Sequence, residues 1–207
     1  MAEMSTNRLE AFSDGVIAII VTIMVLELRA PSQPTLPALW KVAPVFLSYG
    51  LSFLVVAIMW VNHHHLIHAV RGVTARLLWT NIYLLFWMSL VPFVTDFLGK
   101  NYREPLAVAL YGLDLVLCSS AFYLLRIILI EQDRHDSALA DYHASIQRKN
   151  AFSAALYLLS VPLAYVSIYA SFFIFALIPA MYFLPEKNLV AAADATIPSR
   201  EKRREPR

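Results

Sequence analysis

The sequence predicts an all-α, polytopic membrane protein with six transmembrane helices and with both termini in the cytoplasm. Hydrophobic residues make up 59% of its 207 residues and charged residues only 15%, against about 45–50% and about 25% in soluble domains. Mean hydropathy is +0.59. A soluble domain could not bury this much apolar surface, so the composition excludes an ordinary soluble enzyme and a disordered chain.

The first predicted span covers residues 9–28, and it is unusual in carrying acids. Its middle is apolar, but Glu10, Asp14 and Glu27 lie near its ends. Acids inside a span usually face a bundle interior or a water path rather than lipid. Asn7 lies three residues before Glu10, which is the pattern of a helix N-cap and predicts that this helix starts there.

Five further crossings follow from charge-poor stretches, each compared with the roughly 20 helical residues needed to cross about 30 Å of hydrocarbon. The stretches are residues 42–61, 77–95, 105–125 and 151–185. Asp114 is the single charged residue among them, and it could pair within the bundle or face water. The 151–185 stretch is too long for one crossing, so we expect two crossings joined by a turn near Ser167 to Ser171.

The distribution of Lys and Arg sets the orientation. With a cytoplasmic N-terminus, 12 of the 17 basic residues fall in inside segments and 4 in outside loops, as the positive-inside rule requires. We therefore expect residues 1–187 to form a multi-pass domain of six helices in the lipid bilayer of the cell membrane. Residues 188–207 are polar and then of mixed charge, which predicts a disordered cytoplasmic tail.

One face of the first span combines bulky aliphatic side chains with a hydroxyl. Ile19, Ile23 and Leu26 stand at positions i, i+4 and i+7 and so share a helix face. Thr22 lies beside this stripe. Plain packing is one interpretation of the pattern. Asp14 and Glu27 at its two ends favour the other interpretation, a path with water at both mouths.

Three motifs follow one another in the first half of the chain: Arg8-x-x-x-Phe12-Ser13-Asp14, Trp60-x-x-His63-His64, and Asn81 followed by Leu90-x-Pro92-Phe93-x-Thr95. Their order and spacing resemble the lysosomal potassium-channel family of the transmembrane protein 175 type. Animal members of that family carry two six-helix repeats, and this chain resembles the short bacterial members with one. The second half of the chain is similar in hydropathy alone.

The resemblance implies a potassium-permeable cation channel that assembles as a homotetramer, with K⁺ as permeant ion and no cofactor or bound metal. The first helix of each subunit would line the pore, and Ile19, Ile23 and Leu26 would form its constriction. Thr22 would match the position tied to preference for potassium over sodium. The remaining matched residues would brace the first helix against the next two; they are Arg8, Phe12, Ser13, Asp14, Trp60, Asn81 and either His63 or His64.

Elementary physics agrees with this function. The chain has no TVGYG-like run, so ion selectivity has to come from side chains rather than a carbonyl filter. A ring of aliphatic side chains resists wetting and blocks ions until it widens. One helix cannot enclose a pore, so several subunits are needed. No GxSxG, Walker A, HExxH or GxGxxG motif is present, and we expect no enzyme activity and no nucleic-acid partner.

Two other functions remain open at this point, besides a structural membrane module without ion flux. Asp14 and the histidine cluster are compatible with a proton-conducting channel or a proton-coupled transporter. The cluster comprises His63, His64, His65 and His68, and His64 and His68 have the i, i+4 spacing of metal ligands on a helix. A membrane metal or haem protein is therefore the second alternative, although no Cys or acid lies in that segment.

Overall fold

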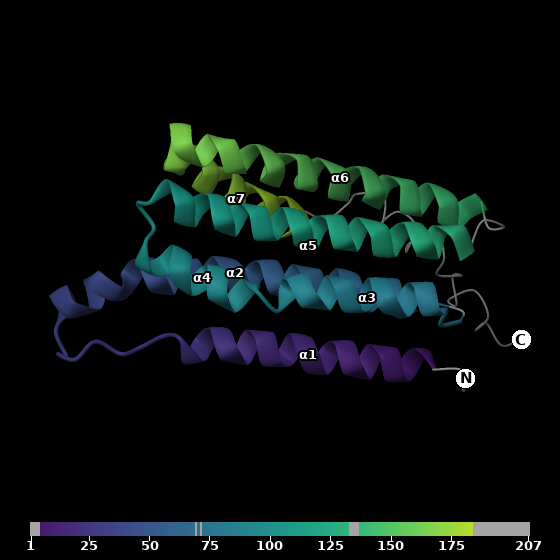
Figure 1. Ribbon diagram of the computed structural model, residues 1–207, viewed down its shortest axis with the longest axis horizontal. Coiled ribbons are helices and arrows are strands. Elements are labelled where there is room, and N and C mark those ends of the chain that lie inside the picture. Colours follow the sequence, from purple (N-terminus) through teal and green to yellow (C-terminus); the bar gives the residue numbers. More distant parts are fainter. Residues whose placement is uncertain (1–4, 69, 71, 133–136, 184–207) are drawn as a thin grey trace, which may run out of the picture.

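The computed structural model describes residues 5–68, 70, 72–132 and 137–183, and within them it confirms the all-α prediction (Figure 1). The helices are α1 (Thr6–Leu26), α2 (Leu36–His68), α3 (Ala75–Met88), α4 (Val91–Lys100), α5 (Pro105–Gln132), α6 (Ser137–Val166) and α7 (Ile168–Phe183). The predicted tail, 188–207, and the end of the predicted six-helix domain lie outside the described residues.

The predicted third span is a pair of helices with a break between them. Together α3 and α4 cover Ala75–Lys100, which is long and apolar enough to cross a membrane once. At the break, the Ser89 backbone N–H still donates to Leu85 O at 2.9 Å. Pro92 lies at the start of α4 and has no N–H to donate to the carbonyl four residues earlier. The predicted third span is therefore two helical segments and not one continuous helix.

Four of the expected crossings are helices long and apolar enough to span a bilayer: α1, α2, α3 with α4, and α5. The shorter α7 is also apolar. It follows α6 after a break at Ser167, which confirms the predicted turn, and Ser171 Oγ donates to Ser160 O at 2.8 Å to tie α7 to α6. Six crossings and cytoplasmic termini remain predictions.

Helix α1 begins earlier than the sequence pattern indicated. It starts at Thr6, and Ser5 is its N-cap with extended backbone but no side-chain hydrogen bond. The Asn7 N-cap prediction was therefore wrong, because the extended backbone that a cap requires is at Ser5 and Asn7 already lies inside the helix.

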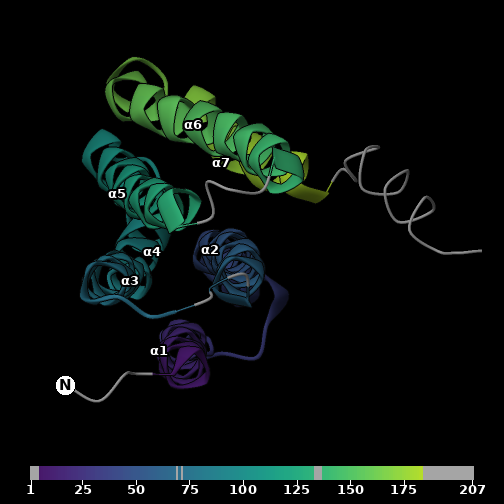
Figure 2. The same ribbon diagram turned by 90° about the vertical axis from the view of Figure 1, so that its right-hand side faces the viewer.

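Helix α1 lies at one side of the bundle, which positions the candidate site. It packs against α2, α3 and α4, and the end-on view shows it beside α2 and α3 and far from α6 and α7 (Figure 2). The hydrophobic core includes one face of α1, with Leu9, Ile17, Ile20 and Met24, together with residues of the other helices. A Cβ added at Gly99 of α4 would lie 2.8 Å from Val45 Cα, so this glycine permits the close approach of α4 to α2.

Candidate functional site

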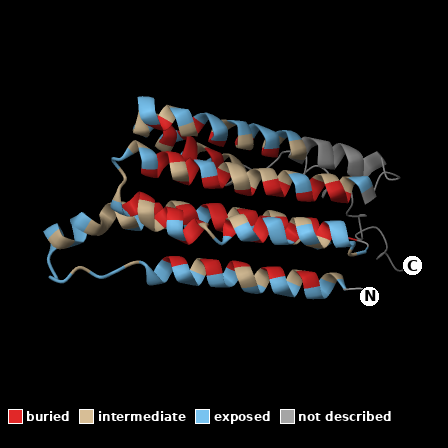
Figure 3. Cartoon of the chain, in the orientation of Figure 1, coloured by how far each residue is buried: buried red, intermediate tan, exposed pale blue. Residues whose placement is uncertain are grey.

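Helix α1 has one buried and one exposed face (Figure 3). Its buried residues recur at helical spacing and are Leu9, Ser13, Ile17, Ile20 and Met24. They pack toward α2, α3 and α4, the helices that α1 contacts. The opposite face has no partner within the described residues of this single chain.

The residues predicted to form the constriction are on the exposed face. Exposed fractions are 58% for Ile19, 42% for Ile23 and 77% for Leu26. At 3.6 residues per turn these three positions fall within an arc of about 60°. Thr22 is also exposed, and its hydroxyl donates to Ile19 O at 2.9 Å. Because its proton is used inside the helix, the hydroxyl oxygen keeps lone pairs for another partner.

An open groove of about 540 Å³ borders this face, between α1 and the break that joins α3 to α4. Ile19, Ile23 and Phe93 supply apolar lining, and Glu27 and Asp96 supply two carboxylates. Lys100 Nζ lies 2.6 Å from Asp96 Oδ2 and balances that charge. The groove is thus apolar along the helix and acidic near the C-terminal end of α1.

A buried hydrogen-bond network fixes the other face of α1. Ser13 Oγ donates to Leu9 O at 2.9 Å and accepts from Asn81 Nδ2 at 2.9 Å. Asn81 Oδ1 lies 2.7 Å from His63 Nε2, which therefore carries the donated proton. Ser13, His63 and Asn81 are each 0% exposed. One residue each from α1, α2 and α3 is joined by this chain of bonds.

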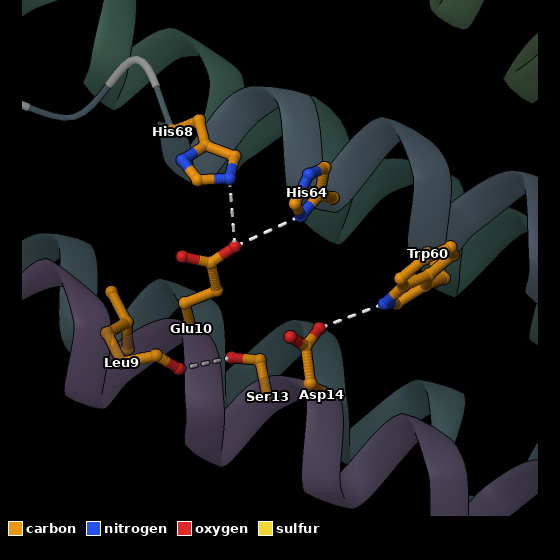
Figure 4. Close-up of polar contacts among 7 residues, drawn as sticks. All are labelled: Leu9, Glu10, Ser13, Asp14, Trp60, His64 and His68. Carbon is orange, nitrogen blue, oxygen red and sulfur yellow. Dashed lines mark hydrogen bonds and ion pairs between the residues drawn. The ribbon is translucent and has the colours of Figure 1, made fainter.

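A second set of contacts joins α1 to α2 nearer the surface (Figure 4). Trp60 Nε1 donates to Asp14 Oδ1 at 2.9 Å. Glu10 Oε1 lies 3.0 Å from His64 Nδ1 and 3.3 Å from His68 Nε2. Two of the three acids that made the first span unusual, Glu10 and Asp14, therefore lie against α2, where polar side chains compensate their burial.

The structure brings together most of the bracing residues that the motifs indicated. Two of them, Arg8 and Phe12, are instead exposed, and the Arg8 side chain has no hydrogen bond or ion pair with any described residue. By helical spacing both fall in the same arc as Ile19. Both histidines lie at contacts between helices, because His63 contacts Asn81 of α3 and His64 faces Glu10 of α1.

Sequence reasoning missed the part that Glu10 plays. A usable signal was present, because Glu10 and Asp14 are four residues apart on α1, and Trp60, His64 and His68 repeat the same spacing on α2. Residues at i and i+4 lie on one helix face. Two such rows on packed helices predict matched polar contacts once the pairing of the helices is known.

A further buried chain of polar groups joins α4, α2 and α5. Thr95 Oγ1 lies 2.6 Å from Val91 O and 2.7 Å from Ser52 Oγ. Ser52 Oγ lies 3.0 Å from Tyr111 Oη. Thr95 belongs to the third sequence motif, and its contacts are with the helix bundle and away from the exposed face of α1. Thr95 therefore contributes to the packing of α4 against α2.

Comparison with known proteins finds one matching family and several similar channel proteins. The family model described as endosomal/lysosomal potassium channel TMEM175 matches residues 8–92. The chain is 37% identical over 187 residues to a potassium channel from Chryseobacterium sp. (strain P1-3), covering 90% of this chain and 96% of that one. It is 32% identical over 116 residues to the mouse endosomal/lysosomal proton channel TMEM175, covering 50% of this chain and 23% of that protein.

A solved structure is similar over most of the chain. It is the crystal structure of a lysosomal potassium-selective channel TMEM175 homolog from Chamaesiphon minutus, with a TM-score of 0.77 and 27% sequence identity. The match covers 86% of this chain and 95% of that one. With the near full-length relative from Chryseobacterium and the ordered motifs, these likenesses show that the chain belongs to the TMEM175 family.

Proposed function

We propose that the chain is one subunit of a homotetrameric, potassium-permeable channel in the cell membrane, with six crossings and cytoplasmic termini. The observation that carries this proposal is the exposed face of α1. Ile19, Ile23 and Leu26 stand there together with Thr22, while the opposite face is fixed by buried contacts. Identical α1 faces around a common axis would enclose a narrow apolar conduit.

In this assembly the aliphatic side chains form the gate. Rings of Ile19, Ile23 and Leu26 exclude water from a narrow pore, and a dewetted constriction blocks ions until it widens. The Thr22 oxygen, whose proton is donated to Ile19 O, presents lone pairs that can replace part of the hydration shell of a cation. Glu27 at the groove adds negative charge that favours cations over anions, whereas Lys100 balances the charge of Asp96.

A face directed toward lipid is the competing interpretation of the same stripe. An all-aliphatic face would suit lipid equally well. The neighbouring hydroxyl of Thr22 and the carboxylates of Glu27 and Asp96 do not, because polar groups in contact with hydrocarbon are costly. The names of bacterial relatives as potassium channels support the same choice.

The test is a flux measurement in liposomes that contain the purified chain. We expect Ile23→Asn to wet the constriction and to raise potassium leak several-fold. Leu159→Asn is the matched control, because Leu159 is 53% exposed on α6, far from α1. Equal leak in wild type, Ile23→Asn and Ile19→Asn would contradict a constriction at this face.

Proton conduction is the second candidate function. Glu10, Asp14, His64 and His68 lie close together between α1 and α2, and the mouse relative is named a proton channel. Flux in separate potassium and proton gradients distinguishes the two. If Asp14→Asn abolished proton flux alone and left potassium flux intact, proton conduction would become the better proposal.

A further inference from the structure

The contact between Glu10, His64 and His68 gathers three metal-ligating side chains from two helices (Figure 4). Each offers one ligand atom, and these atoms all lie within 4.8 Å of one another. Glu10 comes from α1, and the two histidines occupy successive turns of α2. The sequence spacing alone gave two ligands, and the packing of α1 on α2 supplies the third.

The distances fit a tetrahedral metal ion. Zinc binds imidazole nitrogen and carboxylate oxygen at about 2.0–2.2 Å, which places tetrahedral ligand atoms about 3.3 Å apart. Glu10 Oε1 is 3.0 Å from His64 Nδ1 and 3.3 Å from His68 Nε2. Since all three ligand atoms lie within 4.8 Å of one another, side-chain rotations can direct them toward one ion.

The geometry of His64 is not explained by a hydrogen bond to Glu10. Its Nδ1 is shielded from solvent and has no hydrogen-bond partner, although Glu10 Oε1 is only 3.0 Å away. The two atoms are close, but an N–H on His64 Nδ1 would not point toward Glu10 Oε1. A metal ion between the two atoms would use the nitrogen lone pair and the carboxylate at once.

The surroundings hold the site while leaving it accessible. The Trp60 ring stacks on His64 with a centroid separation of 5.8 Å, and Asp14 fixes the Trp60 indole through its Nε1. The side chains of His64 and His68 are 36% and 60% exposed, against 17% for Glu10. An ion can therefore enter from solvent, and a water molecule can complete the coordination.

We propose that Glu10, His64 and His68 bind one divalent transition-metal ion of the zinc class and that the bound ion clamps α1 onto α2. This site is separate from the aliphatic face of α1, and binding does not depend on ion conduction. It is therefore testable whether or not the chain conducts potassium.

The test is titration of the purified, untagged full chain in detergent with Zn²⁺, in competition with a chromophoric chelator. We expect one ion per chain, with affinity reduced at least tenfold in His64→Ala and in Glu10→Gln. His65→Ala is the matched control, because His65 is exposed on the same helix and outside the cluster. It should bind like wild type.

A variant with a spectroscopic signature distinguishes direct coordination of the metal ion by residue 68 from an indirect, structural effect on metal affinity. In His68→Cys loaded with Co²⁺, a thiolate-to-cobalt charge-transfer absorption should appear that is absent from wild type loaded with the same ion. Unchanged zinc affinity in both His64→Ala and Glu10→Gln would overturn the proposal. Absence of the thiolate absorption in His68→Cys would overturn it too.

Discussion

Replacing Asn81 with leucine removes the amide that joins α3 to α1 through Ser13 and to α2 through His63. Leucine is close to asparagine in shape and somewhat larger, so the substitution leaves little cavity. It removes the bond from Asn81 Nδ2 to Ser13 Oγ at 2.9 Å and the bond at 2.7 Å between Asn81 Oδ1 and His63 Nε2. All three side chains are fully buried, so water does not replace the lost partners.

The expected destabilisation follows from which groups lose their partners. Ser13 keeps its bond to Leu9 O, whereas the His63 Nε2–H is left buried without an acceptor. An unsatisfied buried donor costs about 1–3 kcal/mol, and interhelical hydrogen bonds in membranes average about 0.6 kcal/mol with a maximum of about 1.7. We therefore expect Asn81→Leu to lower the free energy of unfolding by about 2–4 kcal/mol.

The assay is reversible unfolding in mixed detergent micelles, followed by circular dichroism. Asn62→Leu is the control, because the Asn62 amide donates to Ile58 O within its own helix and joins no second helix among the described residues. Ser13→Ala should cost less than Asn81→Leu. Since either substitution breaks their shared bond, the double variant should be less destabilised than the sum by about 1 kcal/mol.

Two outcomes would refute this reasoning. Asn81→Leu could prove no more destabilising than Asn62→Leu, which would mean that the network adds nothing beyond bonds within a helix. Alternatively, Ser13→Ala and Asn81→Leu could be strictly additive. Additivity would show that their 2.9 Å contact does not couple α1 to α3 energetically.

Two further predictions test other parts of the molecule. Gly99→Ala should lower the free energy of unfolding by about 1–3 kcal/mol through overpacking, because the new Cβ would lie 2.8 Å from Val45 Cα. Gly50→Ala is the control and should be neutral or slightly stabilising, because a Cβ there has nothing within 4 Å. Equal effects of the two substitutions in the same unfolding assay would contradict the close approach of α4 to α2. Thr22→Val should reduce the potassium-to-sodium flux ratio in liposomes without changing the oligomeric state on size exclusion; an unchanged ratio would place selectivity elsewhere.

The candidate site was only partly predictable from the sequence. The ordered motifs identified Ser13, Asp14, Trp60 and Asn81 because they are spaced as a recognisable set. They did not distinguish His63 from His64, since adjacent residues on a helix point about 100° apart. Which of them faces α3 depends on how α2 is rotated about its own axis. That rotation is set by packing and not by the local sequence.

The apolar stretches that become helices could be read from the sequence, although not their exact ends, because hydropathy and charge are properties of each segment and act before any segment meets another. The turn at Ser167 and the charge-poor stretch of α2 follow directly from this. That Glu10 lies against His64 and that Ile19 lies on the open side of α1 could be learned from the folded chain alone. Such pairings depend on the rotation and contact of whole helices, which are fixed by the summed packing of the bundle.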